Sequence, residues 1–382
     1  MIILSKQTIY EMTSNIPKKP FYAMTNYLYL ILLIFTLNFL FPQQNIFCED
    51  TQLLKAELTS KQALLTYPYN KGKLSFPRDE GIHSPTEFPY TIMEWFAFYS
   101  HLTTEDGRKY FLFSTFITYD PIEAILMGQF PHVITTFVDI KNSKTYSYRC
   151  QKKLLRFAKG HADIKAADGN YFKWKGEHMP FQYEYYINVK NPHFEYTVDL
   201  DLLMIKPPLI INGTGYIKEP KGTSGYYSQT RVKTEGFLTI NGVKEKVKGI
   251  QWIDRQWLGA SFVMNMNYSY QWWSIQLDNN EEAIMFKIWD KTTDTVAMTL
   301  LEINHANGKR EKVEKFTLKE LSTGWQLSAP QVDWNLKIIP ACKNQKIWKA
   351  CTISGTINNK AVKGVGVAEL AKNIGKDLAK FH

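Results

Sequence analysis

The stretch "FEYTVDLDLLMI", from Phe194 to Ile205, decides the fold class of this chain. Its large apolar side chains fall on every second position, and Glu195, Thr197, Asp199 and Asp201 fall between them. Successive side chains of a β-strand point to opposite faces of the sheet. The alternation therefore predicts a strand with one buried face and one solvated face.

Turn-forming pairs recur along the rest of the chain, at Asp106-Gly107, Asp168-Gly169, Asn241-Gly242 and Asn307-Gly308. Each pair favours a two-residue turn with positive φ between two strands. Helical periodicity occurs only near the C-terminus, in "GVAELAKNIGKDLAKF" (residues 366–381). Many short strands joined by such turns predict an all-β barrel or sandwich.

A weak internal repeat indicates how the strands are organised. "MEWFAFYSHLTTEDGRKYFLF" (residues 93–113) is similar to "YQWWSIQLDNNEEAIMFKIW" (residues 270–289), and the aromatic pair Trp95-Phe96 corresponds to Trp272-Trp273. In a chain of 382 residues, the repeat predicts two related β-barrels in tandem. The boundary is expected near "KEPKGTSG" (residues 218–225), which is rich in glycine, proline and lysine.

The N-terminal region contains an apolar run, "NYLYLILLIFTLNFLF" (residues 26–41), which follows Lys18 and Lys19 and ends at Pro42. A basic flank, a short apolar core and a polar exit are typical of a secretory signal. Because no small-residue cleavage site follows, a membrane anchor is the alternative. We therefore expect an exported protein, periplasmic or secreted, in which residues 1–48 are a signal peptide or an anchor that contacts the membrane.

Charge and cysteine content narrow the classes of partner. The 46 Lys and Arg residues exceed the 36 Asp and Glu residues, but they do not cluster. We expect a solvated basic surface and no nucleic-acid partner, with attraction to anionic lipid as the lesser alternative. Cys342 and Cys351 fit either a disulfide of an exported protein or two free buried thiols. The sequence has no Cys–His metal spacing, no Gly-rich phosphate loop and no Gly-x-Ser-x-Gly element.

The stretch "GIQWIDRQWLGASF" (residues 249–262) carries the main candidate for chemistry. On a strand, Trp252, Asp254 and Gln256 share one face. Burial among aromatic rings raises the pKa of a carboxyl group, so that it can donate a proton near neutral pH. Tryptophan faces can stabilise a cation, so this combination suits protonation of an alkene through a carbocation. The alternative is a turn aspartate bonded to nearby backbone amides, with the tryptophans in the core.

A second candidate is "YYSQTRV" (residues 226–232), which places Tyr227, Gln229 and Arg231 on one strand face. This polar face is expected to line a pocket beside the Asp254 strand. Arg231 is expected to pair with a buried carboxylate such as Glu94 or Asp254. An ordinary salt bridge between strands is the alternative.

A third candidate is "GIHSPTEFPYTIMEWFAFYSHL" (residues 81–102). His83 lies in a proline-containing loop, and Glu94 begins a strand before Trp95. Glu94 is expected at a barrel mouth. The alternatives are a surface histidine and a structural glutamate paired with Arg231.

Four elements, "HSPTEFPYTIMEWFAF", "YYSQTR", "WIDRQW" and "YQWWSIQLD", occur in this order and resemble the lipocalin-like family that includes the carotenoid 1,2-hydratases (hydroxyneurosporene synthases) and the AttH-like exported proteins. The resemblance covers roughly residues 81–370, and its most specific element is Trp-x-Asp-x-Gln-Trp at residues 252–257. It implies two lipocalin-type barrels with a hydrophobic pocket. It also implies addition of water to the terminal double bond of an acyclic carotenoid, without a metal or an organic cofactor. Asp254 corresponds to the proton donor.

The sequence departs from the family pattern in several places, among them two elements of the expected pocket. Glu94-Trp95-Phe96-Ala97 stands where the family has Glu-Trp-Trp-Tyr, and Ile347-Trp348-Lys349-Ala350 has a base where the family has an acid. Both departures fall where the pocket is expected. The resemblance therefore supports the fold and does not identify the substrate.

Together these features predict an all-β protein with two tandem lipocalin-like (calycin) antiparallel barrels, residues 75–222 and 223–375. We expect it to bind a hydrophobic isoprenoid, polyene or lipid ligand and to protonate an alkene through Asp254, with Gln256 or Tyr227 positioning the attacking water. The alternatives are a non-catalytic carrier or cell-envelope factor, and a structural surface protein with filled barrels. The expected pocket residues are Trp252, Gln256, Trp257, Tyr227, Gln229, Arg231, Trp272, Trp273, Glu94, Trp95 and His83.

Overall fold

The computed structural model of the chain describes residues 74–76, 78–83, 91, 93–119, 132–150, 154–158, 160–179, 182–191, 196–219, 222–258 and 268–371. The chain divides into two units, residues 1–60 and 61–382, and all described residues belong to the second unit. The expected signal or anchor segment lies outside the described residues. Among the helices of the described part, none has the length and apolar character needed to span a membrane.

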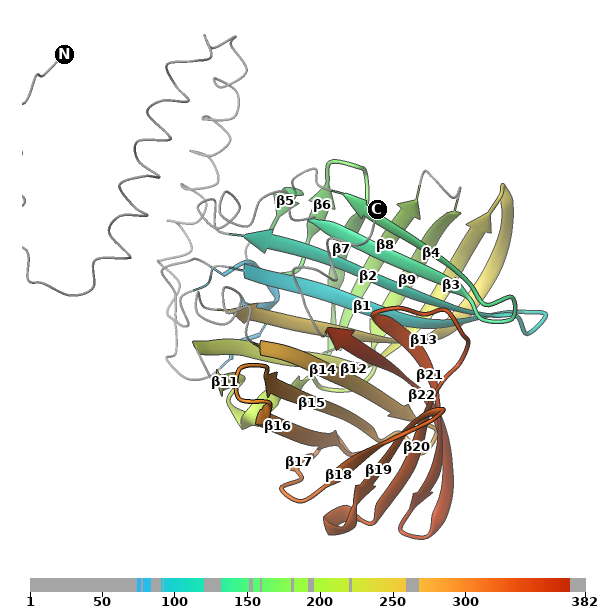
Figure 1. Cartoon of the computed structure of the whole chain (residues 1–382). Helices are drawn as coiled ribbons and strands as arrows, with labels where there is room; N and C mark the ends of the chain where they lie inside the picture. Colours follow the sequence, from blue (N-terminus) through green and yellow to red (C-terminus); the bar gives the residue numbers. More distant parts are fainter. Residues whose placement is uncertain are drawn as a thin grey trace, which may run out of the picture. The chain divides into compact units, whose positions relative to one another are not determined.

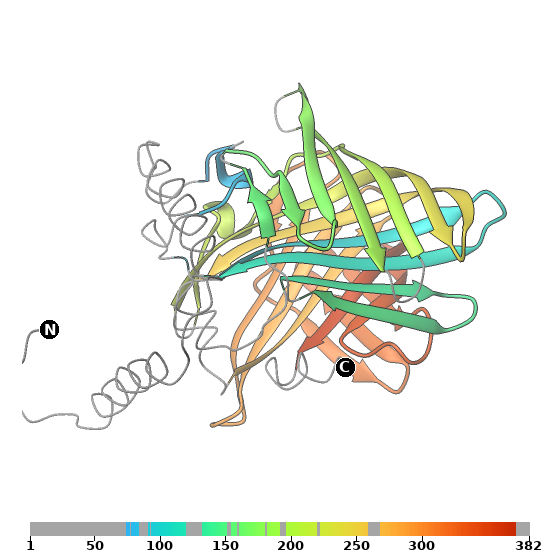
Figure 2. The ribbon, with the colours of Figure 1, turned by 90° about the horizontal axis from the view of Figure 1, so that it is seen from above.

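The described residues form antiparallel strands in two sheets, which lie against each other in Figures 1 and 2. The first sheet, with 13 described strands, has the order β4-β3-β2-β1-β13-β12-β9-β8-β7-β6-β5, and β10 and β11 pair with β12. Its strands are β1 (Met93–Thr104), β2 (Lys109–Tyr119), β3 (Val133–Asp139), β4 (Lys144–Cys150), β5 (Leu154–Phe157), β6 (Ile164–Ala166), β7 (Tyr171–Met179), β8 (Gln182–Asn191), β9 (Tyr196–Met204), β10 (Leu209–Ile210), β11 (Tyr216–Glu219), β12 (Gly222–Ile240) and β13 (Val243–Leu258).

The second sheet has nine described strands in the order β17-β16-β15-β14-β22-β21-β20-β19-β18. Short 3₁₀ turns η1 (Arg78–Glu80), η2 (Ile211–Gly213) and η3 (Pro330–Val332) complete the described elements. The strands of the second sheet are β14 (Tyr268–Leu277), β15 (Glu282–Asp290), β16 (Thr295–Asn304), β17 (Arg310–Lys312), β18 (Thr317–Leu321), β19 (Gly324–Ala329), β20 (Trp334–Pro340), β21 (Trp348–Ile357) and β22 (Lys360–Ala371).

The all-β prediction, with two lipocalin-like barrels, is confirmed.

The opening stretch forms β9, and its alternation is confirmed. Tyr196, Val198, Leu200, Leu202 and Met204 are buried, and the side chains between them are more accessible. Burial of such apolar side chains is the main favourable contribution to folding.

The chain passes from the first sheet to the second between Leu258 and Tyr268, later than the boundary expected between residues 222 and 223. The strands after residue 222 belong to the first sheet because β12 pairs with β9 and β13 pairs with β1. The composition shift at residues 218–225 instead marks the short hairpin in which Glu219 of β11 pairs with Gly222 of β12.

The turn predictions are confirmed in part. All four glycines of the turn pairs have positive φ. Only Asn241-Gly242 forms the two-residue turn with positive φ at both positions, and it joins β12 to β13. At the other three pairs, the glycine amide closes a turn onto the carbonyl three residues earlier.

The helical interpretation of the C-terminal stretch is wrong for residues 366–371, which belong to β22. Gly364 and Gly366 lie so close to β14 that a Cβ atom on either would come within 2.2 Å of a carbonyl oxygen. Pairing with β14 therefore overrides the local periodicity. Residues 372–382 lie outside the described part.

The internal repeat corresponds to two equivalent hairpins, β1–β2 and β14–β15. Trp95 and Trp272 face the apolar layer between the sheets, whereas Phe96 and Trp273 face the interior cluster of their own sheet. We call this layer the inter-sheet layer. Its principal aromatic residues are Tyr99, Phe111, Phe113, Tyr226 and Trp252 of the first sheet, and Trp272, Phe286 and Trp348 of the second.

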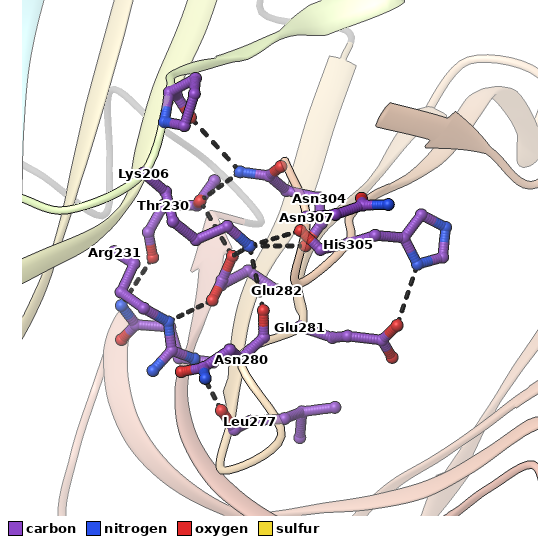
Figure 3. A network of polar contacts seen from close by, with 12 residues as sticks. Lys206, Thr230, Arg231, Leu277, Asn280, Glu281, Glu282, Asn304, His305 and Asn307 are labelled. Carbon is purple, nitrogen blue, oxygen red and sulfur yellow. Dashed lines mark hydrogen bonds and ion pairs between the residues drawn. The ribbon is translucent and has the colours of Figure 1, made fainter. Parts of the chain in front are cut away.

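A buried polar network also joins the two sheets (Figure 3). The Lys206 ammonium contacts Oε2 of Glu282 at 2.6 Å and donates to the His305 carbonyl at 2.7 Å. Arg231 forms an ion pair with the same carboxylate and donates to the Leu277 carbonyl at 2.6 Å. Two cations, Arg231 of β12 and Lys206 just after β9, therefore share one buried carboxylate of the second sheet.

We predict that Glu282→Gln strongly destabilises the protein, because it leaves Lys206 and Arg231 partly buried without a counter-charge. Breaking a buried ion pair in this way typically costs about 3–5 kcal/mol. Urea unfolding should show a loss of this size. The control is Glu235→Gln, which breaks an exposed pair with Lys233 and should cost less than about 1 kcal/mol. Equal losses in the two variants would contradict a special role for the network.

Candidate functional site

Asp254 lies within β13, in the centre of the first sheet, and faces the inter-sheet layer. It pairs with Ala97 of β1 on one side and with Ser228 of β12 on the other. Its side chain is buried, and Oδ1 accepts hydrogen bonds from Ser228 Oγ at 2.6 Å and from Trp252 Nε1 at 3.4 Å. The residue lies in a strand and not in a turn, and its carboxyl group is held by side chains.

Burial raises the pKa of the Asp254 carboxyl to about 7. The hydrogen bonds from Ser228, Tyr226 and Trp252 act in the opposite direction, and the charge of Glu369 raises the pKa further. Desolvation disfavours the ionised form of a carboxyl, and the donors offset this only in part. Asp254 can therefore hold its proton close to neutral pH.

Glu369 is a second buried carboxyl in the same layer, and it was not predicted from the sequence. It lies on β22 between Trp272 of β14 and Trp348 of β21. Its Oε2 accepts a hydrogen bond from Tyr99 at 2.9 Å, and its Oε1 accepts one from Tyr270. Burial raises the pKa of Glu369, although the tyrosine hydrogen bonds lower it. The signal in the sequence is a single acid in the apolar run "GVAELA", which is apparent only when the run is interpreted as a strand.

Aromatic rings connect the two carboxyl groups. The Trp272 indole N–H donates to the Tyr226 hydroxyl at 2.7 Å. The Tyr99 ring stacks on Trp272 with centroids 5.0 Å apart, and Trp252 meets the same ring edge-on at 6.0 Å. The layer thus combines two acids with aromatic faces that can stabilise positive charge.

Part of the predicted pocket is brought together at this layer. Trp252, Asp254 and Trp272 meet there, and Trp95 packs against it from β1. Gln256 lies on the Asp254 face of β13 and donates to Ser224 Oγ at 3.0 Å. These five residues therefore lie on the side of their strands that faces the inter-sheet layer, and their part in a ligand pocket stays a prediction.

Tyr227 and Gln229 lie on the opposite face of the first sheet. Both donate to Oε1 of Glu80, from the Tyr227 hydroxyl at 2.9 Å and from Gln229 Nε2 at 2.7 Å. Tyr185 donates to the other oxygen of the same carboxyl at 2.6 Å. Consecutive side chains of β12 point to opposite faces of the sheet. Tyr227 therefore points away from Asp254 and cannot position water beside it.

His83, Glu94 and Trp257 form a separate buried cluster around Arg255. The Arg255 guanidinium pairs with Oε2 of Glu94 at 2.7 Å, and His83 Nδ1 contacts the same oxygen at 3.0 Å. The His83 ring stacks on Trp257 with centroids 3.8 Å apart. Burial raises the pKa of Glu94, but Arg255 and His83 outweigh it, so the pKa is lowered. His83 is thus a buried residue and not a surface one.

The expected pairing of Arg231 with Glu94 or Asp254 is wrong. The β12–β13 register shifts between Gln229 and Val232, which inserts one extra residue into β12. Such a bulge redirects the side chains that follow it. Arg231 consequently leaves the Tyr227 face and reaches Glu282 of the second sheet (Figure 3).

Trp273, also predicted for the pocket, lies in the interior cluster of the second sheet, where it meets Trp325 at 5.8 Å. Cys342 and Cys351 are both free thiols. In the part of the chain that the structure describes, no group of three or more His, Cys, Asp or Glu side chains is arranged to hold a metal ion.

Comparisons with known proteins agree with this architecture. A family model described as AttH-like matches residues 67–370. A crystal structure of a putative AttH from Nitrosomonas europaea is similar over 80% of this chain and 98% of that one, with a TM-score of 0.64 and 17% identity. Kievitone hydratase from Nectria haematococca is similar over 79% of this chain and 94% of that one, with a TM-score of 0.56 and 15% identity. None of the curated proteins matches the sequence.

The raised pKa of Asp254 predicts a specific pH dependence of stability. Its folded pKa of about 7 lies above the ordinary value of 3.8. The stabilisation that the protonated Asp254 carboxyl gives the folded state is therefore fully present below about pH 4 and is lost as pH rises to 7. Between these pH values, we predict that the free energy of unfolding of wild type falls relative to that of Asp254→Asn, by up to about 1.4 kcal/mol per pH unit. Urea unfolding of both proteins at several pH values measures this slope, and a constant difference would contradict it.

Proposed function

Because the chain belongs to the AttH-like family, we propose that it is a lipocalin-like hydratase that adds water to an alkene of an apolar ligand, with Asp254 as the acid. The observation that carries the proposal is the placement of a protonatable carboxyl in a buried aromatic layer. A solved structure with a similar fold carries the name kievitone hydratase, which supports this class of reaction within the fold.

In the first step, Asp254 donates its proton to one carbon of the double bond. The carboxylate that forms is not left without partners, since the Ser228 hydroxyl and the Trp252 indole already donate to Oδ1. Hydrogen bonds to a charged acceptor are stronger than those to a neutral one. The same donors therefore stabilise the enzyme after proton transfer more than before it, as catalysis requires.

In the second step, the carbocation is stabilised by the ring faces of Trp252, Trp272 and Tyr99. Cation–π attraction of this kind is worth about 2 kcal/mol or more where water is excluded. Water then attacks the cation and loses a proton, which gives a neutral alcohol, and Asp254 is protonated again before the next turnover. Gln256, on the Asp254 face, is the residue we assign to positioning this water. The net reaction consumes only water, so the reaction as written requires no metal or organic cofactor.

The ligand is proposed to be an isoprenoid, polyene or lipid-like molecule, because aromatic and aliphatic side chains with a few polar groups favour an apolar ligand. We further propose that the protein is exported and that the N-terminal apolar segment contacts the membrane. Native mass spectrometry of the purified protein, followed by organic extraction, would identify a bound ligand directly.

We predict that Asp254→Asn abolishes hydration of lycopene, used as a probe in detergent micelles, and leaves binding of the probe nearly unchanged. The amide retains the size of the side chain but cannot donate the proton. Product is measured by the mass increase of one water, and binding by quenching of tryptophan fluorescence.

The matched control is Glu80→Gln. Glu80 is also a buried carboxyl whose pKa is raised by burial, but it lies on the opposite face of the first sheet. Turnover should survive in this variant. Full turnover in Asp254→Asn would refute the acid role. Binding of a co-purified apolar ligand without any product from it would favour the alternative function, a non-catalytic carrier or cell-envelope factor.

A further inference from the structure

The reaction proposed above does not use Glu369, although it is a buried carboxyl among the aromatic side chains of the inter-sheet layer. The residue is 9% exposed. It lies opposite Trp272 on one neighbouring strand and opposite Trp348 on the other. The hydroxyls of Tyr99 and Tyr270 donate to its two oxygens. Two phenol donors stabilise the ionised form of a carboxyl and prepare it to act as a base.

Glu369 and Asp254 belong to different sheets and are connected through the same aromatic groups. Tyr99 donates to Glu369 and stacks on Trp272. The Trp272 indole donates to Tyr226, whose hydroxyl in turn hydrogen-bonds Asp254. The two acids therefore flank one set of aromatic faces, one acid from each sheet.

The titratable groups that face Asp254 are Tyr226 of β12, Tyr99 of β1, Tyr270 of β14 and Glu369 of β22. Burial raises the pKa of each of the three tyrosines well above its usual range, so they remain neutral donors. The charge of Glu369 raises the pKa of Asp254. Burial raises the pKa of Glu369 as well, so the two carboxyls titrate as a coupled pair.

We propose that Glu369 is the general base of the hydration, so that Asp254 and Glu369 form an acid–base pair across the two sheets. This inference rests on the proposed function. The Asp254 O–H bond breaks as a C–H bond forms, and the water oxygen then forms the C–O bond while its proton passes to Glu369. The product is a neutral alcohol, and the proton returns from Glu369 to Asp254 before the next turnover. In the reverse direction, Glu369 is the acid and Asp254 the base of a dehydration.

The pair also specifies a class of substrate. Protonation by a carboxyl of pKa about 7 requires an alkene that gives a stabilised cation. The substrate is therefore an apolar alkene whose cation is tertiary or benzylic, and it carries no charge of its own in the part that enters the layer. An ionised substrate group would lose its hydration among the aromatic side chains without a matching cation.

The first test needs no substrate. Infrared spectroscopy follows the protonated carboxyl band of wild type, Asp254→Asn and Glu369→Gln during a pH titration. Wild type should show a transition near pH 7 that is absent in Asp254→Asn. In Glu369→Gln this transition should move down by about one pH unit or more, as for strongly coupled carboxyls. An Asp254 transition at the wild-type pH in Glu369→Gln overturns the pairing.

Circular dichroism first establishes that each variant is folded. If Glu369→Gln does not fold, Tyr270→Phe replaces it, with isotope-labelled glutamate to identify the Glu369 band. Loss of one phenol donor should move ionisation of Glu369 to higher pH. An unchanged Glu369 transition would then overturn the pairing.

The second test uses lycopene in heavy water. Wild type should both hydrate the probe and incorporate deuterium into it. Glu369→Gln should lose about a hundredfold or more of the hydration rate, the typical contribution of a general base, and should still incorporate deuterium, because Asp254 still protonates the alkene reversibly. Asp254→Asn should lose both activities. Hydration at the wild-type rate in Glu369→Gln, or equal loss of both activities, overturns the base role.

The two tests also separate failure of this inference from failure of the proposed function. If wild type neither hydrates lycopene nor incorporates deuterium, the hydration of this probe and the base role on it are refuted. A shifted Asp254 transition in Glu369→Gln would still establish the coupled pair in that case.

Discussion

The burial of both faces of the central strands is the constraint on which the rest of the structure depends. Strand β13 carries Ile253 and Arg255 into the interior of the first sheet and Trp252 and Asp254 into the inter-sheet layer. The side chains of Asp254 and Arg255, which are adjacent in the sequence, therefore lie on opposite faces of the sheet. If Arg255 faced the same side, it would lower the pKa of Asp254 and remove its capacity to donate a proton near neutral pH.

The distribution of buried cations follows from the same constraint. Arg255 pairs with Glu94, and Lys206 and Arg231 share Glu282. The groups with the largest influence on Asp254 and Glu369 include no cation, and their pKa values are raised mainly by burial. Buried ion pairs contribute little net stability because their desolvation is costly. Here they hold the two sheets and the η1 segment in place, so that the uncompensated acids stay in a buried aromatic layer.

The sequence predicts the features that follow from alternating side chains along a strand. It does not predict the features that depend on how neighbouring strands are paired in register. The strand at residues 196–204, the two equivalent hairpins and the shared face of Trp252 and Asp254 all follow from a period of two. The bulge after Gln229 redirects Arg231, and a bulge leaves no clear signal in a single sequence. Glu369 was missed because its stretch also has helical periodicity, and only pairing with β14 fixes it as a strand. The site residues then fall into separate clusters, because sequence order does not reveal which face of a two-sided sheet a residue occupies.

The two departures from the family pattern take on different meanings once the faces are known. Lys349 follows Trp348, which lies in the inter-sheet layer, and its ammonium donates to the Gln345 carbonyl at 2.8 Å. Since consecutive side chains alternate, the replacement of an acid by this base does not place a cation beside Asp254 or Glu369. Ala97, by contrast, pairs directly with Asp254 across β1 and β13, where side chains on the same face have Cβ atoms only about 5 Å apart. Ala97 itself contributes only a methyl group at a position where the family has a tyrosine. The departure closest to Asp254 is therefore the one at Ala97, and the one at Lys349 places no cation beside Asp254 or Glu369.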